Sequence, residues 1–507
     1  MTTTPEKTGT FASLDPRTGD VVATHPIHSA EDVAAAVMRA REESAWWMAL
    51  SFEERAEHLL TWKGVVTRRM QQLADLMHRE TGKPHGDAAL EVALAIDHLH
   101  WAATHAKKHL DRRRVPSGLL MANQAASVAY RPLGVIGVIG PWNYPVFTPM
   151  GSIAYALAAG NAVVFKPSEF TPGVGEWLAR TFLEAVGRPV FSVVTGLGDT
   201  GAALCRAGVD KVAFTGSTAT GKRVMAACAE TLTPVVIEAG GKDAVIVDHD
   251  ADLDAAVEAS LWGACANAGQ TCAGVERVYV HELVYDQFVA QLAAAAKELR
   301  ATDSADSPIG PITMPKQLEI IRSHIADALA RGGRALVGGT DAVGDRFVQP
   351  TVLVDVPEDS LAVTEETFGP TVTVRKVATV EEAIELTNRS KYALGSTVFS
   401  KARGMEIAEQ VRSGMTAING VITFAAVPAL PFGGVGDSGF GRIHGADGLR
   451  EFTYPKAITR QRFKPALALT TFKRTAKADQ QLISMMTMMH GRGTTLPKAM
   501  KPRRGER

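Results

Sequence analysis

Short apolar segments alternate with helix-length segments between residues 126 and 214, and this alternation constrains the fold more than any other feature. The segment VIGVI at 135–139 is apolar throughout, as is typical of a strand covered on both faces of a parallel sheet. The patterns that follow it are helical over 148–159, 173–186 and 198–207 and strand-like at 162–165, 191–194 and 211–214. Strands that alternate with helices in this way predict a doubly wound α/β layer.

Helical patterns also dominate the N-terminal third, where apolar residues recur at three-to-four spacing over 31–43 and 52–79. A second set of alternating strands and helices runs from about 240 to 440. The chain has 507 residues, 46% of them hydrophobic, which is enough apolar material for two or three domains. We therefore predict an α/β protein with two doubly wound α/β domains.

The sequence gives no indication of a membrane-spanning helix or a metal site. No run of 18 or more uncharged apolar residues occurs, and the polar segment 1–10 lacks the apolar core of a signal peptide. The four cysteines, Cys205, Cys228, Cys265 and Cys272, suit a reducing cytosol, and no CxxC or Cys/His metal spacing occurs. We expect a cytoplasmic protein without a metal and without a nucleic-acid partner, in which all cysteines except Cys272 are structural.

The formal net charge of zero hides an uneven distribution. Residues 461–507 carry 11 Lys/Arg and 2 Asp/Glu, whereas residues 1–460 carry 43 and 52, so a basic tail follows a mildly acidic body. Helical spacing places four apolar residues of the tail on one face, with Gly491 as a candidate helix end, and these four are Leu482, Met485, Met486 and Met489. Such a helix with flanking cations suits either an anionic membrane surface or a neighbouring subunit.

Three segments supply the groups needed for covalent acyl chemistry. Cys272 ends the small-residue turn NAGQTC, which leaves a thiol accessible. Glu238 follows an apolar strand in VIEAGGK, and Asn143 lies at a strand end in GPWNYP. A thiol nucleophile, a carboxylate base and an amide donor can together attack a carbonyl, activate water and stabilise an oxyanion.

Two glycine-rich motifs bear on nucleotide binding. GSTATGK at 216–222 follows an apolar strand and opens a helix, so its backbone N–H groups can attract a phosphate. It is not a complete P-loop, because Arg223 stands where a hydroxyl would hold magnesium. GVGDSG at 434–439 matches GxGxxG literally, but no clear strand precedes it, and we interpret it as a mobile glycine loop at a domain edge.

In order and in spacing, these motifs resemble those of the aldehyde dehydrogenase superfamily, from about residue 10 to about residue 460. The matching strings are PWNYP at 141–145, KPSE at 166–169, FTGSTATG at 214–221, EAGGK at 238–242, GQTC at 269–272, EETFGP at 365–370 and PFGG at 431–434. The separation of 34 residues between Glu238 and Cys272 also resembles that of the family.

The resemblance implies an NAD-dependent, non-acylating enzyme that oxidises an aldehyde substrate to the carboxylic acid. Cys272 would form a thiohemiacetal and then a thioester, Glu238 would activate water, and Asn143 would stabilise the oxyanion. The coenzyme contacts that it implies are Trp142, Lys166, Ser168, Glu169, Gly216, Ser217, Gly221, Gly240, Glu366 and Phe368. The Glu169 carboxylate suits two ribose hydroxyls and repels a 2′-phosphate, which favours NAD over NADP.

Two departures from the family pattern indicate a subgroup. Many relatives carry a Lys where this chain has Ser152 and a Glu where it has Ile443. Their joint absence is similar to the class that accepts medium- and long-chain or aromatic aldehydes, and it leaves the proton route open. One alternative is a dehydrogenase that passes the thioester to coenzyme A, which the retained Glu238 disfavours. The other is a non-catalytic relative, which the retained Cys272 disfavours.

The resemblance also implies a domain layout with a small protruding β domain for oligomerisation. The NAD-binding domain would comprise 1–113 and 133–239, the catalytic domain 240–449, the oligomerisation strands 114–132 and 450–464, and the basic tail 465–507. Exposed strand edges need a partner, so we expect a homodimer or a homotetramer. The tail is the part of the chain that would make a peripheral membrane contact.

Overall fold

A parallel sheet of short apolar strands lies at the centre of the first half of the chain. In the computed structural model, which describes residues 9–304, 307–465, 467 and 469–491, its strand order is β19-β9-β8-β5-β6-β7. The strands are β5 (Val135–Ile139), β6 (Ala162–Lys166), β7 (Phe191–Val193), β8 (Lys211–Thr215), β9 (Val235–Glu238) and β19 (Gly439–Phe440). All except β19 run parallel, so the predicted doubly wound layer is confirmed.

The helices of this half follow the predicted order with two differences: the long helix over 85–110 was not predicted, and the helix predicted over 52–79 is divided. They are α1 (Ala30–Ala49), α2 (Phe52–Arg68), α3 (Met70–Thr81), α4 (His85–Leu110), α5 (Phe147–Ala159), α6 (Pro172–Val186), α7 (Gly198–Arg206) and α8 (Thr218–Ala229). Ser29 and Ser51 begin α1 and α2 through capping boxes with Asp32 and Glu54. The helix predicted over 52–79 is two helices, because Arg69 leaves the helical conformation at φ −113° and ψ 19° with no Gly or Pro to signal it.

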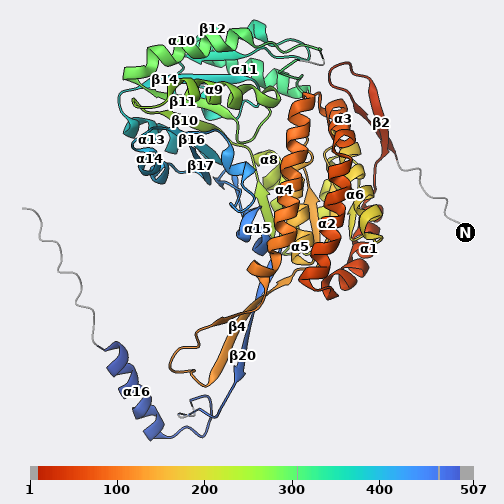
Figure 1. Cartoon of the computed structure of the whole chain (residues 1–507), viewed down its shortest axis with the longest axis vertical. Coiled ribbons are helices and arrows are strands. Elements are labelled where there is room, and N and C mark those ends of the chain that lie inside the picture. The colour runs from red at the N-terminus through yellow and green to blue at the C-terminus, as the bar shows by residue number, and fades with distance from the viewer. Residues whose placement is uncertain (1–8, 305–306, 466, 468, 492–507) are drawn as a thin grey trace, which may run out of the picture. The chain divides into compact units, whose positions relative to one another are not determined.

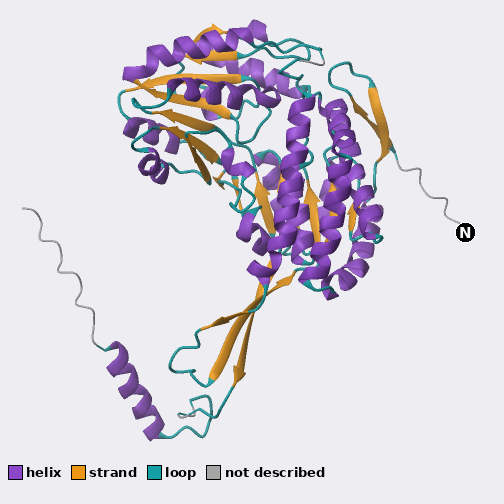
Figure 2. Ribbon diagram, in the orientation of Figure 1, coloured by secondary structure: helices purple, strands orange, loops and turns teal. Residues whose placement is uncertain are grey.

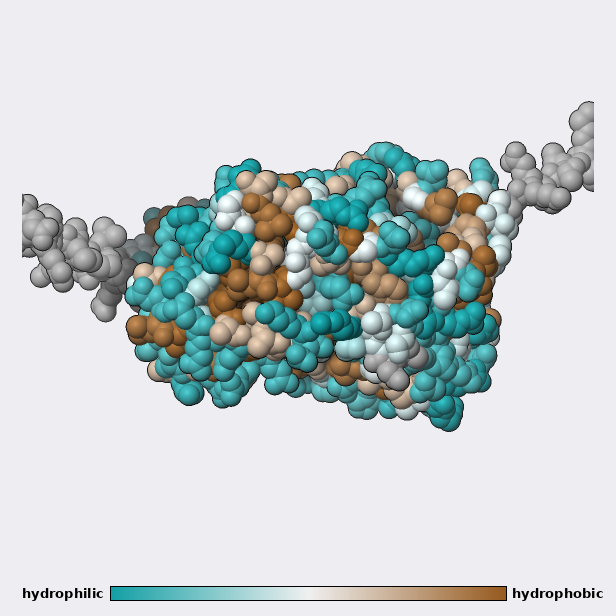
Figure 3. All heavy atoms as spheres, turned by 90° about the horizontal axis from the view of Figure 1, so that it is seen from above, coloured by the Kyte–Doolittle hydropathy of each residue, from teal (hydrophilic) through white to brown (hydrophobic). Residues whose placement is uncertain are grey.

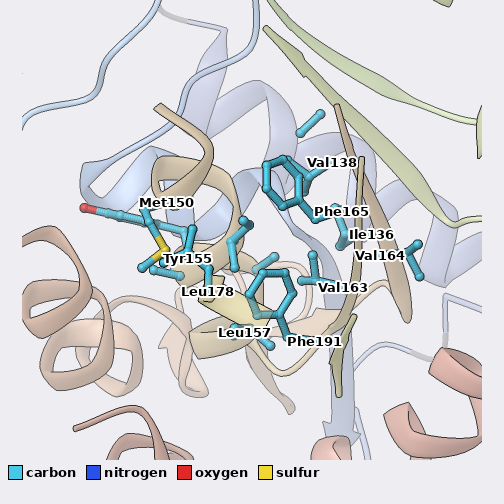
Figure 4. Packing of buried hydrophobic residues seen from close by; sticks show 14 of the residues in the cluster. Ile136, Val138, Met150, Tyr155, Leu157, Val163, Val164, Phe165, Leu178 and Phe191 are labelled. Carbon is cyan, nitrogen blue, oxygen red and sulfur yellow. The ribbon is translucent and has the colours of Figure 1, made fainter. Parts of the chain in front are cut away.

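The core of this half lies between the sheet and its helices. Figure 4 shows Phe165 and Phe191 beside the strand residues Ile136 and Val163, with Leu178 of α6 among the same group. All of these side chains are buried, and the rings of Phe165 and Phe191 are 6.4 Å apart. Close packing of this kind fixes the strand ends from which the candidate site residues project.

A second α/β layer follows, with the strand order β12-β13-β14-β11-β10-β16-β17. Its strands are β10 (Asp243–Val247), β11 (Val275–His281), β12 (Arg334–Val337), β13 (Thr351–Val354), β14 (Thr371–Val377), β16 (Gly395–Phe399) and β17 (Met415–Ile418). Its helices are α9 (Leu253–Cys265), α10 (Glu282–Glu298), α11 (Lys316–Ala330), α12 (Leu361–Thr364), α13 (Val380–Asn388) and α14 (Gly404–Gln410), and α15 (Gly445–Glu451) follows the layer. Only the edge strand β12 is antiparallel, and Figure 2 shows helices packed around both sheets.

The described residues form two compact units, one within 9–111 and 130–454 and the other within 112–129 and 455–491. The first holds both α/β layers, the two-stranded ribbon β1 (Thr10–Leu14) and β2 (Val21–Pro26), and the short pair β15 (Tyr392–Ala393) and β18 (Val435–Gly436) (Figure 1). A space-filling view shows apolar patches between hydrophilic side chains (Figure 3). The predicted boundary between the coenzyme and catalytic domains stays a prediction.

The second unit contains most of a sheet in the order β20-β4-β3, formed by β20 (Thr453–Gln461), β4 (Gln124–Pro132) and β3 (Arg113–Val115). The predicted tail helix is present as α16 (Ala476–His490), capped by Thr475 and ended by Gly491 in a right-handed conformation. The last 16 residues of the tail lie outside the described residues. Among the described residues, no helix is long and apolar enough to cross a bilayer.

Candidate active site

The turn before Cys272 is strained and firmly held. Asn267 and Ala268 both have positive φ, at 51° and 56°, which is rare for residues other than glycine. Gly269 follows at φ 72°, and a Cβ there would collide with the backbone of Gly369. The turn therefore adopts a conformation that only close packing maintains, and it presents Cys272 at the start of the segment leading into β11.

Asn143 lies against this turn and takes part in holding it. Its Nδ2 donates to the carbonyl oxygen of Gln270 at 2.9 Å, and its own carbonyl accepts from Asn267 Nδ2 at 3.0 Å. The Asn143 amide thus uses one of its two hydrogens on the turn and keeps the other for a further acceptor. Sequence reasoning did not foresee this structural use of the amide.

Glu238 ends β9 and is almost fully buried, at 3% exposed, yet neither of its carboxyl oxygens has a hydrogen-bond partner in the described structure. Burial raises its pKa well above the usual range, although Arg442 opposes the shift. A Cβ on Gly433 would lie 2.6 Å from Glu238 Oε1, so the glycine lets the chain pass close to the carboxyl group. Such a carboxyl group suits a base that works near neutral pH.

Three carboxyl groups surround the half-buried thiol of Cys272. Burial is the largest cause that raises the pKa of Cys272 to about 12, and the negative charges of Glu366, Asp243 and Glu238, which oppose the thiolate, contribute to the same rise. The pKa of Glu366 is itself raised to about 8 by burial, and that of Asp243 to about 7. In the structure as it stands, the thiol form of Cys272 is therefore favoured at neutral pH, and a base or a bound cation must assist its ionisation.

Apolar side chains from several elements gather around the thiol and define what we call the Cys272 apolar cluster. Its buried members are Phe147, Ala273, Leu394, Met415, Ala417, Phe424, Ala425, Phe432 and Ile443, and Leu94, Tyr144, Ile422 and Cys272 itself are partly buried against them. The Tyr144 hydroxyl lies 3.0 Å from Thr271 Oγ1, which satisfies the one polar group of its ring. The apolar surface that these side chains present suits an apolar reactant.

The predicted coenzyme residues fall into three groups. Lys166 Nζ and Glu169 Oε2 are 3.7 Å apart at the end of β6, and Ser168 donates to the same carboxylate at 3.2 Å. Glycine is needed at 216, where a Cβ would lie 2.7 Å from the ring of Phe214, and Ser217 caps α8. Bare N–H groups at the start of a helix next to a side-chain-free position fit a dinucleotide phosphate.

The third group surrounds the carboxyl group of Glu366. Gly241 N–H donates to Glu366 Oε1 at 2.9 Å, and a Cβ on Gly240 would collide with the same carboxyl group. The rings of Trp142 and Phe368 meet edge to face at 5.5 Å. Gly221 packs against β9, where a Cβ would lie 3.1 Å from Ile237 Cγ2, so it serves packing of α8 on the sheet. Of these residues, Trp142, Gly240, Glu366 and Phe368 suit the nicotinamide half of a coenzyme beside Cys272.

Two buried ion pairs behind the site were missed by sequence reasoning. Lys83 pairs with Glu91 on α4 and donates to the carbonyl of Asn143 at 2.9 Å, while Glu91 accepts from Val146 and Phe147 N–H at 2.8 and 3.0 Å. In the same manner, Lys242 pairs with Glu276, which accepts from the backbone of residues 367 and 368. Single charged residues inside helical and strand patterns carry no signal that would have identified them.

The prediction of a mobile GxGxxG loop at 434–439 is wrong. The segment forms two short strand pairings, in which β18 pairs with β15 and β19 pairs with Glu238 and Ile237 of β9. Ser438 is fully buried, and its hydroxyl donates to the Gly240 carbonyl at 2.8 Å and accepts from Ala393 N–H. The glycines allow close approach to β9.

Among the described residues, no group of three or more His, Cys, Asp or Glu is placed to hold a metal ion.

Comparison with known proteins gives a consistent family. Residues 3–458 match the model of the aldehyde dehydrogenase family. The chain is 33% identical over 497 residues to the 4,4′-diapolycopene aldehyde oxidase of Methylomonas sp, with 97% of this chain and 93% of that protein covered. It is 37% identical over 448 residues to the glutarate-semialdehyde dehydrogenase of Pseudomonas aeruginosa, with 86% and 91% covered. The structure of an NADP-dependent enzyme of E. coli superposes with a TM-score of 0.85 at 33% identity, covering 89% of this chain and 95% of that one.

Proposed function

Because the chain belongs to the aldehyde dehydrogenase family, we propose that it oxidises an apolar aldehyde to the carboxylic acid with NAD, through a thioester on Cys272. The observation that carries the proposal is the convergence of three groups beside an uncharged cluster. These groups are the Cys272 thiol, the buried carboxyl of Glu238 and the amide of Asn143. Each group has a chemical task in such an oxidation.

The reaction begins when the Cys272 thiolate adds to the carbonyl carbon and converts the carbonyl oxygen into an oxyanion. The remaining N–H of the Asn143 amide and the Cys272 backbone N–H stabilise that oxyanion, each by about 3–4 kcal/mol for donors of this kind. Collapse of the adduct expels the aldehydic hydrogen with its electron pair and leaves a thioester. When bound, the nicotinamide ring supplies the acceptor for that hydride. Glu238 then takes a proton from water, whose oxygen attacks the thioester and releases the acid.

Glu169 supports NAD rather than NADP as the coenzyme. Its carboxylate stands at the end of β6 beside Lys166, where it can accept hydrogen bonds from ribose hydroxyls and repel a 2′-phosphate. The buried Lys166 can still attract a phosphate, and a solved relative is described as NADP-dependent, so a direct comparison of the two coenzymes is needed. Retention of Glu238 supports hydrolysis of the thioester rather than transfer to coenzyme A.

The Cys272 apolar cluster supports an apolar aldehyde over an acid semialdehyde. Its side chains present apolar surface beside Cys272, and apolar surface favours contact with a hydrocarbon group over contact with a substrate carboxylate. Ile443 belongs to the cluster and Ser152 is buried on α5, at the two positions where many relatives carry charges. A hydrocarbon chain or an aromatic ring therefore suits these surroundings better than a charged one.

The proposal is tested by the appearance of NADH absorbance on a panel of aldehydes. We expect octanal, dodecanal and benzaldehyde to be oxidised with NAD and without coenzyme A, and succinate semialdehyde to be a poor substrate. Faster reaction with NADP would overturn the role of Glu169. A requirement for coenzyme A would favour the acylating alternative, and absence of turnover with every aldehyde would favour a non-catalytic relative.

We propose that the enzyme is a homodimer or a homotetramer. In the second unit, β20 carries mostly exposed side chains and β3 ends the same three-stranded sheet, so the sheet has edges available for pairing. We expect sedimentation equilibrium at micromolar concentration to give two or four times the mass of 54.0 kDa. A single species of 54.0 kDa would contradict the proposal.

We further propose that the tail at 465–507 brings this cytoplasmic enzyme to an anionic membrane surface. α16 buries none of its residues. Of its predicted apolar face, Leu482, Met485 and Met486 are half-buried and Met489 is 37% exposed. Outside that face, Ile483 and Met488 are 64% and 75% exposed, and Phe472 before the helix is fully exposed. Basic residues outnumber acidic ones 11 to 2 over 461–507, whereas acidic residues are in excess over the rest of the chain. Apolar side chains with flanking cations are the two contributions that peripheral membrane helices combine.

Coverage of the relatives supports this assignment. The alignment with the 4,4′-diapolycopene aldehyde oxidase covers 97% of the chain, so it reaches α16, whereas the one with the glutarate-semialdehyde dehydrogenase covers 86%. The relative whose alignment reaches α16 is named a 4,4′-diapolycopene aldehyde oxidase, and a predominantly apolar aldehyde partitions out of water. A membrane contact would place the active site near such a substrate.

We expect the full chain to co-sediment with anionic vesicles and a chain ending at Lys464 to remain in solution. The matched variant Ile483→Ser/Met488→Ser should bind at least tenfold more weakly, because burying each apolar side chain is worth roughly 1.5–3 kcal/mol. Both side chains are exposed, so their loss removes little packing from the protein itself. Equal binding of full-length and shortened chains, or binding by neither, would rule out the membrane contact.

A further inference from the structure

His444, which no step of the proposed reaction uses, is held in a backbone conformation that residues other than glycine normally avoid. Its backbone has φ 62° and ψ 165°, a region that is accessible essentially to glycine alone. Its side chain is buried, and Nε2 has no hydrogen-bond partner in the described structure. A strained backbone and an unpartnered buried nitrogen both destabilise the fold, so neither explains why a histidine stands here.

The backbone on both sides of His444 holds it in place. Ile443 exchanges two hydrogen bonds with Phe432, at 2.9 and 2.7 Å, and so fixes the residue before it. Gly445 N–H donates to the Pro428 carbonyl at 3.0 Å, and the first turn of α15 begins with Gly448 N–H donating to His444 itself at 2.7 Å. The chain therefore has no freedom to relax the strained residue, and the ring is presented at one defined place.

The His444 ring borders the Cys272 apolar cluster. The imidazole ring lies 5.3 Å from the ring of Phe147 and 5.5 Å from that of Phe432, both members of the cluster. Tyr155, which Figure 4 labels, is 5.6 Å away, and the ring of His98 is only 3.9 Å away. A flat ring fits a space bounded by rings at such distances, whereas a branched aliphatic side chain would not.

Gly151 on α5 completes the space that the imidazole fills. A Cβ there would lie 2.5 Å from His444 Nε2 and 2.8 Å from Ile443 Cδ1, so the ring occupies the volume that a side chain at 151 would take. The neighbouring His98 cannot supply the missing partner, because its Nε2 donates to the Ala425 carbonyl at 3.0 Å and its Nδ1 lies 3.4 Å from the Tyr155 hydroxyl. Burial lowers the pKa of His98 to about 4 and that of His444 well below its usual range, so both rings are neutral at pH 7.

We propose that His444 is a specificity-determining residue, whose ring fills the space left by Gly151 and forms the inner wall of the aldehyde pocket. This inference rests on the proposed function and deepens it, because it states what limits the size of the apolar aldehyde. The ring packs against Phe147 and Phe432, and these two side chains and Ile443 belong to the cluster against which Cys272 packs. A longer or broader acyl group would have to displace the imidazole.

The test is His444→Gly, which removes the ring and leaves a residue that adopts φ 62° without strain. We expect the ratio of kcat/KM for 2-naphthaldehyde to that for benzaldehyde to rise about tenfold, the usual scale for a small volume change in an apolar pocket. The double variant Gly151→Leu/His444→Gly refills the space from α5 and should restore a ratio close to that of the wild type. Equal losses for both aldehydes, or a ratio unchanged within twofold, would overturn the proposal.

Two measurements keep this test separate from the proposed function and from folding. Binding of 2-naphthoate and benzoate to the same variants in a Cys272→Ala background, measured calorimetrically, should show the same change of ratio without any turnover. An inactive wild type would defeat the proposed function and leave this binding ratio to decide the role of His444. Thermal unfolding should show that Gly151→Ala lowers Tm in the wild type and raises it in the His444→Gly background, because alanine favours a helix once the ring is absent.

Discussion

Replacing Cys272 by alanine should abolish NADH formation while the folded protein and its coenzyme binding persist. Cys272 supplies the only thiol of its cluster, whereas Cys205, Cys228 and Cys265 are buried. Without the sulfur, the aldehyde cannot form the tetrahedral adduct whose carbon releases the hydride. We expect kcat/KM to fall at least a thousandfold, which corresponds to a loss of roughly 4 kcal/mol or more of transition-state stabilisation.

The matched control for this prediction is Cys265→Ala. Burial raises the pKa of Cys265 to about 12, as it does for Cys272, but Cys265 ends α9 and packs in the core of the second layer. It should retain kcat/KM within a few-fold and lose some thermal stability, because a buried sulfur is removed from a packed core. Residual kcat/KM above about a thousandth in Cys272→Ala would mean that another group performs the chemistry.

The raised pKa of Cys272 also predicts how its reactivity depends on pH. A thiol whose pKa is about 12 is protonated at pH 7, so its alkylation by iodoacetamide in the coenzyme-free enzyme should be slow and should accelerate as pH rises. NAD, the proposed coenzyme, carries a positive nicotinamide ring that would favour the Cys272 thiolate if Glu366 and its neighbours held it there, so its addition should accelerate alkylation at constant pH. Alkylation at the same rate from pH 6 to 9 would contradict the burial of the thiol.

The two layers could be predicted from the sequence because their strands are continuous apolar runs that no other structure accommodates. VIGVI at 135–139 and the segments after it became β5 to β8 within about a residue of their expected ends. The positions of Asn143 and Glu238 followed, since the carboxyl ends of parallel strands meet at one edge of a sheet. The gathering of Cys272 with these two residues required the family motifs, because nothing local joins residues so far apart.

What escaped prediction depends on contacts between segments that are distant in the sequence. The role of Lys83 becomes apparent only in the fold, where α4 brings Glu91 beside it and the Lys83 ammonium donates to the backbone carbonyl of Asn143. The strained backbone of His444 follows from hydrogen bonds to segments 428 and 432, and GRIHG alone does not reveal it. The glycines of the segment 434–439 suggested mobility, but in the structure they allow the segment to approach β9 closely. Local propensity does not encode such contacts.

Replacing Glu238 by glutamine should separate the two halves of the reaction. Glutamine keeps the size of the buried side chain but cannot accept a proton from water, whereas addition of the Cys272 thiolate and loss of hydride do not require that proton transfer. We expect a pre-steady-state burst of about one NADH per active site, followed by turnover at least a hundredfold slower than in the wild type, the lower range for loss of a general base.

The burial of Glu238 gives this prediction a pH signature and a matched control. Because its pKa is raised, the carboxyl group is protonated at low pH and becomes a base only as pH rises through that pKa, so the steady-state rate of the wild type should increase with pH. Glu238→Gln should lose this dependence. Glu80→Gln should keep it, since Glu80 is 1% exposed and has a pKa raised to about 7 by burial but binds the backbone of residues 173 and 174 on α6. Equal loss of burst and turnover in Glu238→Gln would show that the carboxylate acts earlier, by taking the proton from Cys272 itself.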